Sequence, residues 1–469
     1  MMKKIEKILT FLIRGVKIQD SLSKLALLSL VFGMTACNSA PPTETQDPNS
    51  TSFQPIELNS PMAKWKKPQP IDFVVEATKN YSFPNWQSGN DQSVYYNMNI
   101  AAFFKSQVIP APETSPSLIE REINRDLLDL TFTDHEGNTT PPLKEYLVGP
   151  KQVQAMIMVH KGKIVFETYP GMNPTGYHVW MSASKTVVGL LACMLWEEGK
   201  LDFEKPISTY VPNLQGTAWD NILVKDVMNM SSALDIEETF ENLINPNSFI
   251  SHFFSYCFGS AEGDWQKLIQ EAQPLKTEKP GEHFHYSSAN TQVLVLMIQN
   301  ITGKPYQDVV GERIWSKIGP KYPFLIGLAP DGTPIGAGMN NTTPEDMVRY
   351  ALLYTPSWNV VADEQIISDK LLKKIQSLGN PAAYENTTES EYGTKWFGQT
   401  PDLNTAQWDH AFNDGAMFKH GNMGQGIYVD PERDFCGIYF GLASNDESVS
   451  GIDHSPGYLR AAAKMLAGE

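Results

Sequence analysis

Strand-like runs stand near both ends of residues 151–469, and mostly helical sequence fills the space between them. Apolar runs at 155–159 and 164–167 flank a glycine-containing turn, which is typical of a β-hairpin, and runs at 426–430 and 435–440 predict a second hairpin. A sheet must bury its apolar faces against other layers. We therefore expect an α/β (α+β) fold, with one antiparallel sheet built from both ends of this region, helices flanking it, and a mostly helical lobe between the two hairpins.

Helices are predicted where apolar residues recur with helical spacing between start and stop signals. The expected helices begin at Ser182 and end before Gly199, run from 290 to 301 ahead of Gly303, start at Thr343-Pro344, and close the chain at 457–467. A further helical pattern covers Leu118 to Leu128.

The most informative chemical pattern is Ser182-Ala183-Ser184-Lys185 at the start of the first of these helices. Residues three apart share a helical face, so the Lys185 amine should reach the Ser182 hydroxyl. A desolvated lysine has a lowered pKa and can take the serine proton, which makes the serine a nucleophile. The same S-x-x-K spacing also occurs at Ser21 and Lys24 in a basic leader, so the spacing alone does not identify a site.

Acyl transfer also needs a proton carrier for the leaving group. The segment 280–290 places Tyr286 just ahead of the apolar helix at 290–301. A phenol beside a lysine ammonium is expected to ionise more easily and to shuttle protons. The alternative is a tyrosine that only packs its ring and fixes a loop.

Several motifs in a fixed order carry a family resemblance. After S-x-x-K come P-G-x-x-F-x-Y-S-S at 280–288 and similar signatures at 300–304, 343–347 and 424–432. This series resembles the serine β-lactamase-related hydrolases, which include class C β-lactamases, D,D-carboxypeptidases and some esterases. The stretch 224–235 is most similar to the 6-aminohexanoate-dimer hydrolase branch. The resemblance covers roughly residues 150 to 469 and implies a β-lactamase/transpeptidase-like fold.

By this resemblance, Ser182 is the acylated nucleophile, and Lys185 and Tyr286 share the acid/base work. The family's third motif, Lys-Thr-Gly or His-Thr-Gly, corresponds to Lys419-His420-Gly421. The oxyanion hole would use the backbone N–H of Ser182 and one near Asn422. No metal site and no cofactor are expected.

Two departures from the family pattern bear on the substrate. His420 replaces the hydroxyl residue of the third motif, and Ser288 replaces the asparagine of Tyr-x-Asn. The resemblance implies that these groups help to hold a β-lactam. We therefore expect a serine hydrolase that cleaves a small amide or ester substrate through an acyl-enzyme, with weak β-lactamase activity.

Three alternatives remain open. The first is a β-lactamase or D,D-carboxypeptidase, and the second is a binding lipoprotein that keeps the fold without the chemistry. The third is a Ser-His-Asp triad using His285, His410 or His420, although no Gly-x-Ser-x-Gly elbow surrounds Ser182.

The N-terminus predicts export. Residues 1–36 combine a basic leader with a short apolar core, which is typical of a signal peptide. The boundary before Cys37 resembles a bacterial lipobox, so Cys37 is the expected lipidation site of a membrane-anchored lipoprotein, periplasmic or at the cell surface. A plain secretory signal is the alternative. Residues 37–60 fit a flexible tether, and the role of 61–150 is open.

Charge and cysteine content exclude several classes of binding partner and site. The formal charge of −16 argues against nucleic-acid binding, and membrane contact is expected only through the lipid. Besides Cys37, the chain has Cys193, Cys257 and Cys436, whose number and spacing suggest neither a disulfide framework nor a zinc site. The sequence leaves the oligomeric state open.

Overall fold

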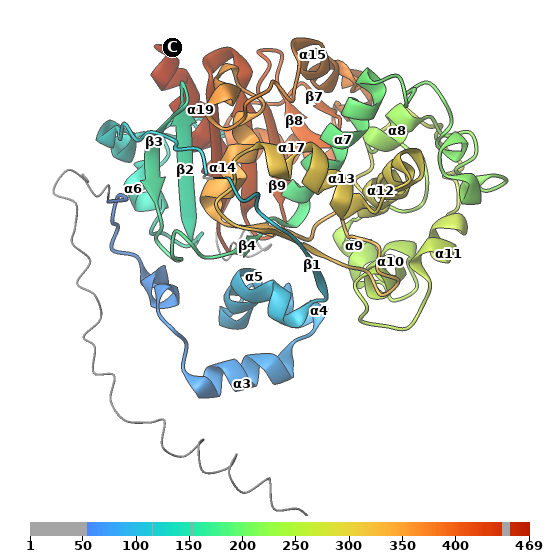
Figure 1. Ribbon diagram of the computed structural model, residues 1–469, viewed down its shortest axis with the longest axis horizontal. Helices are drawn as coiled ribbons and strands as arrows, with labels where there is room; N and C mark the ends of the chain where they lie inside the picture. The colour runs from blue at the N-terminus through green and yellow to red at the C-terminus, as the bar shows by residue number, and fades with distance from the viewer. Residues whose placement is uncertain (1–53, 115, 152, 443–450) are drawn as a thin grey trace, which may run out of the picture. The chain divides into compact units, whose positions relative to one another are not determined.

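A computed structural model gives the fold, and residues Gln54–Glu469 form one compact unit (Figure 1). The structure describes residues 54–114, 116–151, 153–442 and 451–469. The predicted signal peptide at 1–36, the predicted lipidation site Cys37 and most of the predicted tether lie outside these residues. In the part of the chain that is described, no helix is both long and apolar enough to span a bilayer.

A seven-stranded antiparallel sheet forms the centre of the fold, in the order β3-β2-β11-β10-β9-β8-β7. Its strands are β2 (Ala155–His160), β3 (Lys163–Thr168), β7 (Leu403–Thr405), β8 (Trp408–Ala411), β9 (Met417–Gly421), β10 (Gln425–Asp430) and β11 (Phe435–Phe440). Both predicted hairpins are confirmed, as is the sheet built from both ends of the region. The two hairpins join where β2 pairs with β11, with Ile157 opposite Ile438.

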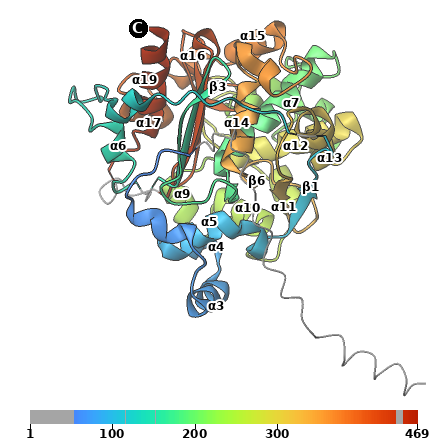
Figure 2. The same cartoon turned by 60° about the vertical axis from the view of Figure 1, so that its left-hand side comes forward.

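Helices cover both faces of this sheet, because alternate side chains of each strand are buried on opposite sides. Ile157 and Val159 belong to a core shared with α7 (Lys185–Glu197) and α14 (Pro344–Leu352). Met156 and Met158 pack into a second core with α17 (Thr388–Phe397) and α19 (Ser455–Ala467). Figure 2 shows the helices on either side of the sheet.

The predicted helices after residue 180 are confirmed. The run from Ser182 forms a 3-10 turn, η3 (Met181–Ser184), that continues into α7, and the Gly199 just beyond has a φ of 72°. The apolar run becomes α12 (Ser288–Thr302), which ends at Gly303 in the left-handed conformation. Thr343 caps α14 by accepting a hydrogen bond from the Asp346 N–H.

The helical lobe, with α8 to α13, lies on the right-hand side of Figure 1, and α7 lies between it and the seven-stranded sheet. Its helices and those beside it are α8 (Val224–Met228), α9 (Phe240–Ile244), α10 (Phe249–Cys257), α11 (Trp265–Gln270), α13 (Tyr306–Arg313), α15 (Asp369–Ser377) and α16 (Pro381–Tyr384). Further 3-10 turns are η1 (Pro61–Lys66), η2 (Arg125–Asp129), η4 (Ile207–Thr209), η5 (Pro212–Leu214), η6 (Trp315–Lys317), η7 (Pro356–Val360) and η8 (Pro431–Arg433).

A second, four-stranded sheet was not expected from the sequence. Its order is β1-β5-β6-β4, with β1 (Ser106–Ile109), β4 (His178–Val179), β5 (Phe324–Gly327) and β6 (Asn340–Thr342). Strands of two to four residues are too short to show a two-residue alternation. β1 brings the N-terminal segment to β5, so this sheet ties that segment to the rest of the fold.

The N-terminal segment contains α3 (Ile71–Asn80), α4 (Phe83–Trp86), α5 (Asp91–Phe103) and α6 (Leu143–Tyr146). α3 packs on α5, while α4 contacts α10, α5 contacts β4 and α6 joins the second core. The helix predicted from Leu118 to Leu128 is wrong. The chain there runs extended beside β3, where the N–H of Glu122 donates to the Ile164 carbonyl at 2.9 Å, and only η2 follows. The edge of β3 has unpaired backbone groups, and pairing with this segment satisfies them at the expense of local helix propensity.

Candidate active site

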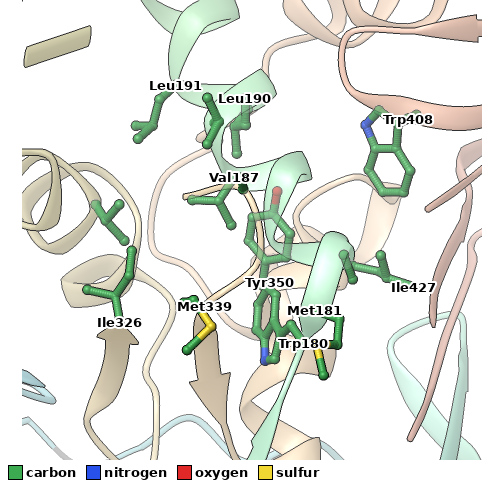
Figure 3. Packing of buried hydrophobic residues seen from close by; sticks show 14 of the residues in the cluster. Trp180, Met181, Val187, Leu190, Leu191, Ile326, Met339, Tyr350, Trp408 and Ile427 are labelled. Atoms are coloured by element: carbon green, nitrogen blue, oxygen red, sulfur yellow. The ribbon is translucent and has the colours of Figure 1, made fainter. Parts of the chain in front are cut away.

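The turn that carries Ser182 is held in an unusual backbone conformation. Met181, directly before it, has a φ of 49°, a region that non-glycine residues seldom occupy. Trp180 is fully buried, and its indole N–H donates to the Thr342 hydroxyl at 2.8 Å. Figure 3 shows Trp180 and Met181 among apolar side chains such as Tyr350. This packing fixes Ser182 at the start of α7 and leaves it partly exposed.

The Lys185 amine lies 3.0 Å from the Ser182 hydroxyl, as the spacing predicts. Lys185 is fully buried, and its other neighbours are the Ser288 hydroxyl at 2.9 Å and the Ala337 carbonyl at 2.6 Å. Burial lowers the pKa of Lys185 to about 7, so much of it is neutral near neutral pH. A neutral amine can donate to Ala337 and Ser288 and direct its lone pair at the Ser182 proton.

Tyr286 lies beside two lysines, with the Lys185 amine 5.2 Å and the Lys419 amine 4.5 Å from its ring centroid. Its hydroxyl accepts a hydrogen bond from the Lys419 amine at 3.0 Å, and the nearby Ser182 side chain acts to lower its pKa. Burial, and then the nearby Asp409 carboxylate, raise the pKa of Tyr286 well above its usual value. The expectation that this phenol ionises more easily is therefore wrong, because these two effects outweigh the neighbouring lysines. The Tyr286 phenol is therefore neutral near neutral pH.

Lys419 is fully buried and forms an ion pair with Asp409 on the neighbouring strand β8. The other Asp409 oxygen accepts the backbone N–H of His420 at 3.1 Å. The His420 ring packs against Trp396 of α17, with ring centroids 4.5 Å apart, and its Nε2 lies 3.9 Å from Asp453. Burial lowers the pKa of His420 to about 4, so this imidazole is neutral. His420 therefore faces α17, while Lys419 reaches Tyr286.

Gly421 brings the end of β9 against the turn that carries Ser182. A Cβ atom at this glycine would lie 2.4 Å from the Trp180 carbonyl oxygen, so no larger residue fits without a shift. Asn422 follows directly. Among the described residues, the backbone N–H groups of Ser182 and Asn422 donate to no protein acceptor. Two such donors on adjoining elements are what an oxyanion hole requires.

None of the three histidines considered for a triad bonds to Ser182. His285 pairs with Glu237 and Glu278, and these contacts raise its pKa to about 9. His410 is buried beside Tyr384, and burial lowers its pKa to about 3. With His420 directed at α17, the geometry favours the lysine-based arrangement.

Three contributors to the site were missed from the sequence. Asp409 neutralises Lys419, the Ala337 carbonyl binds Lys185, and Glu238 accepts the backbone N–H of Ser288 while its charge acts on Lys185. Of these three, only Asp409 had a signal in the sequence, because it is an acidic residue within the otherwise mostly apolar strand 408–411. The other two contacts have no local pattern, because they join segments that are distant in the sequence.

Cysteines and metal-ligating residues are not part of this site. Cys193, Cys257 and Cys436 are buried and unpaired. In the described ranges, no cluster of three or more His, Cys, Asp or Glu side chains has a metal-binding arrangement.

Comparison with known sequences gives matches over the region that contains these residues. A sequence model of the family described as Beta-lactamase matches residues 152–463. The 6-aminohexanoate-dimer hydrolase of Paenarthrobacter ureafaciens is 24% identical over 289 residues, which are 60% of this chain and 70% of that protein. A putative D-alanyl-D-alanine carboxypeptidase of Escherichia coli (strain K12) is 24% identical over 177 residues, covering 36% of this chain and 39% of the carboxypeptidase.

The fold also has a solved counterpart. The structure of a putative 6-aminohexanoate-dimer hydrolase from Bacillus anthracis superimposes with a TM-score of 0.66 at 22% identity, covering 82% of this chain and 98% of that one. The predicted fold class and the predicted family resemblance are both confirmed by these matches.

Proposed function

Because the chain belongs to the β-lactamase family and is a serine hydrolase of that family, we propose that it hydrolyses esters and small linear amides through an acyl-enzyme on Ser182. One observation carries the assignment of the nucleophile. The Lys185 amine is fully buried, has a pKa near 7, and lies 3.0 Å from the Ser182 hydroxyl. Burying a lysine amine beside a partly exposed serine contributes little to stability, but it provides a base that can activate the serine. This arrangement also argues against a protein that only binds.

Acylation begins with neutral Lys185. Its lone pair takes the Ser182 proton while Oγ forms a bond to the substrate carbonyl carbon, and the carbonyl π electrons move onto oxygen. The N–H groups of Ser182 and Asn422 stabilise that oxyanion, and removing one such donor typically costs about 10²–10³ in rate.

The leaving group then departs with a proton. As the carbonyl reforms and the C–O or C–N bond breaks, the Tyr286 hydroxyl protonates the leaving oxygen or nitrogen. Lys419 stabilises the phenolate, and the proton held by Lys185 restores the phenol. Water then attacks the acyl carbon while Lys185 takes its proton, and the carbonyl π electrons again move onto oxygen. When the carbonyl reforms, the C–Oγ bond breaks and Lys185 returns the proton to Oγ, which restores the Ser182 hydroxyl and neutral Lys185. The products are a carboxylic acid and an alcohol or amine.

The charge state of the third motif, Lys419-His420-Gly421, bears on the class of substrate. The resemblance assigns the third-motif lysine and its neighbouring hydroxyl to a β-lactam carboxylate. Here Lys419 is buried and paired with Asp409, and His420 faces Trp396. Lys419 is therefore not free to pair with a substrate carboxylate. Acyl transfer at Ser182 does not require the substrate to carry a carboxylate. This favours uncharged esters and linear amides over β-lactams and D,D-peptides.

The nucleophile is tested by labelling. A fluorophosphonate should label the wild type at Ser182, as peptide mass spectrometry would show, and should not label Ser182→Ala. Hydrolysis of p-nitrophenyl butyrate should fall by on the order of 10⁶ in kcat for that variant. Ser377→Ala, a change at an exposed serine on α15, is the matched control and should behave as wild type. Near-normal ester hydrolysis by Ser182→Ala would refute the assignment.

We also propose that the protein is exported and anchored in a bacterial membrane through lipid on Cys37, with the hydrolase held at the periplasmic or outer surface. The support is the sequence alone: a basic leader, a short apolar core and small residues before the cysteine. In bacteria, the wild type should incorporate labelled palmitate and sediment with membranes, and Cys37→Ser should do neither. Ser39→Ala serves as the control. A soluble, unlabelled wild type would contradict the proposal.

A further inference from the structure

The N-terminal segment reaches the strand end that completes the active site. The Gln87 side-chain carbonyl accepts a hydrogen bond from the Asn422 side-chain amide at 2.6 Å, and both residues are half-buried. Gln87 lies outside residues 152–463, the region that matches the family. The site therefore includes a contact that the family region does not supply.

Gln87 is presented from a rigid support. It follows α4, and its backbone N–H donates to the Phe83 carbonyl at 3.1 Å. Trp86 beside it is buried, and its indole N–H donates to the Asn97 side chain at 2.7 Å. The Phe83 ring stacks on Phe254 of α10 with centroids 5.5 Å apart. A side chain on such a base can fix the position of its partner.

The turn that contains Asn422 is held by its own hydrogen bonds as well as by Gln87. Asn422 opens this turn between β9 and β10, in which Met423 and Gly424 both have positive φ values. The turn is closed without Gln87, because the Gly424 N–H donates to the Gly421 carbonyl at 3.2 Å. The Asn422 carbonyl accepts from the Gln425 side chain at 3.2 Å. The contact with Gln87 therefore adds control over the orientation of Asn422 rather than closing the turn.

We propose that Gln87 is a positioning residue of the hydrolytic site: by holding the Asn422 side chain, it aims the Asn422 backbone N–H into the oxyanion hole. This inference rests on the proposed function. Donors fixed before the reaction stabilise the oxyanion without reorganising, so a loosened donor lowers transition-state binding more than substrate binding.

The test compares Gln87→Ala and Asn422→Ala in the full chain. For p-nitrophenyl butyrate, kcat should fall on the order of tenfold in Gln87→Ala, less than the loss of a whole donor, while KM changes little. The inhibition constant of butylboronic acid, which forms a tetrahedral adduct on serine, should rise by the same factor as kcat/KM falls. Inhibition by the product butyrate should not change. The double variant should be no slower than the slower single variant, because both substitutions break one contact.

Gln69→Ala is the matched control. The Gln69 amide donates to the Lys64 and Lys67 carbonyls at 3.1 and 2.8 Å, within the same segment. It should leave kcat, KM and boronate binding as in the wild type. Thermal unfolding of every variant separates folding from positioning.

The outcomes distinguish the two claims. An active wild type with an equally active Gln87→Ala would overturn the role of Gln87 and leave the proposed function standing. Equal losses in boronate and butyrate binding, or multiplicative losses in the double variant, would also overturn it. A wild type that neither reacts with fluorophosphonate nor cleaves esters would overturn the proposed function and this role together.

Discussion

Asp409 and Lys419 form a buried ion pair across neighbouring strands, and this pair fixes the cation that bonds to the Tyr286 hydroxyl at 3.0 Å. Lys419 is fully buried and the Asp409 side chain is 5% exposed, so neither charge is compensated by water. The pair thereby links the strands β8 and β9 to Tyr286, the proposed proton donor of the site.

Asp409→Ala should therefore be strongly destabilising. Removing one partner of a buried pair leaves the other charge unpaired, which costs about 3–5 kcal/mol. Urea unfolding at neutral pH measures the change. Asp91→Ala removes the partner of Lys64 in a pair whose side chains are 59% and 53% exposed, and it should cost about 0–1 kcal/mol. Equal effects of the two substitutions would show that the Asp409 pair is not electrostatically important.

The pH profile should report Lys185. The amine accepts the Ser182 proton only when neutral, so kcat/KM for an ester should rise with pH, with a midpoint near the Lys185 pKa of about 7. The Glu238 charge raises that pKa, so Glu238→Gln should move the midpoint to lower pH. Glu237→Gln, which alters a contact of His285, is the control and should leave the midpoint in place. A midpoint unmoved by Glu238→Gln would contradict this account.

Gly421→Ala should impair catalysis through the nucleophile turn. The added Cβ would lie 2.4 Å from the Trp180 carbonyl oxygen, so β9 and the Ser182 turn must separate. Small displacements of reacting groups can cost on the order of 10² in rate. At Gly338, an added Cβ meets the Met181 carbonyl carbon at 3.8 Å, an ordinary contact, and Gly338→Ala should stay close to wild type. Steady-state kinetics of ester hydrolysis would measure both variants. Equal rates for Gly421→Ala and Gly338→Ala would contradict a requirement for close contact between β9 and the Ser182 turn.

The protein should prefer esters to β-lactams. With Lys419 neutralised by Asp409, kcat/KM for p-nitrophenyl butyrate should exceed that for a chromogenic cephalosporin measured on the same preparation. A site without a matched partner for a required polar group can lose several orders of magnitude. Efficient cephalosporin turnover with negligible ester cleavage would instead favour the β-lactamase alternative.

The sequence by itself determined whatever depends on neighbours along the chain. Three-residue spacing at the start of a helix sufficed to place Lys185 beside Ser182. The turn residues located both hairpins, an apolar run with Gly303 located the helix predicted at 290–301 to within two residues of its start, and Thr343-Pro344 located the start of α14. Motif order added Tyr286 and the strand 417–421 to the site, through a family resemblance that the comparisons confirm. In each case, a short-range pattern or an ordered motif carried the information.

Only the tertiary structure decided which distant groups meet, and how far they are buried. The sequence placed Lys419 near the substrate, but its pairing with Asp409 depends on the register of β8 and β9, and the neutrality of Tyr286 depends on burial. The contact between Gln87 and Asn422 joins the N-terminal segment to the far end of the chain. Hydrogen bonding along the unpaired edge of β3 likewise overrode the helical pattern at 118–128. Such contacts and desolvation energies arise from packing, which no local spacing specifies.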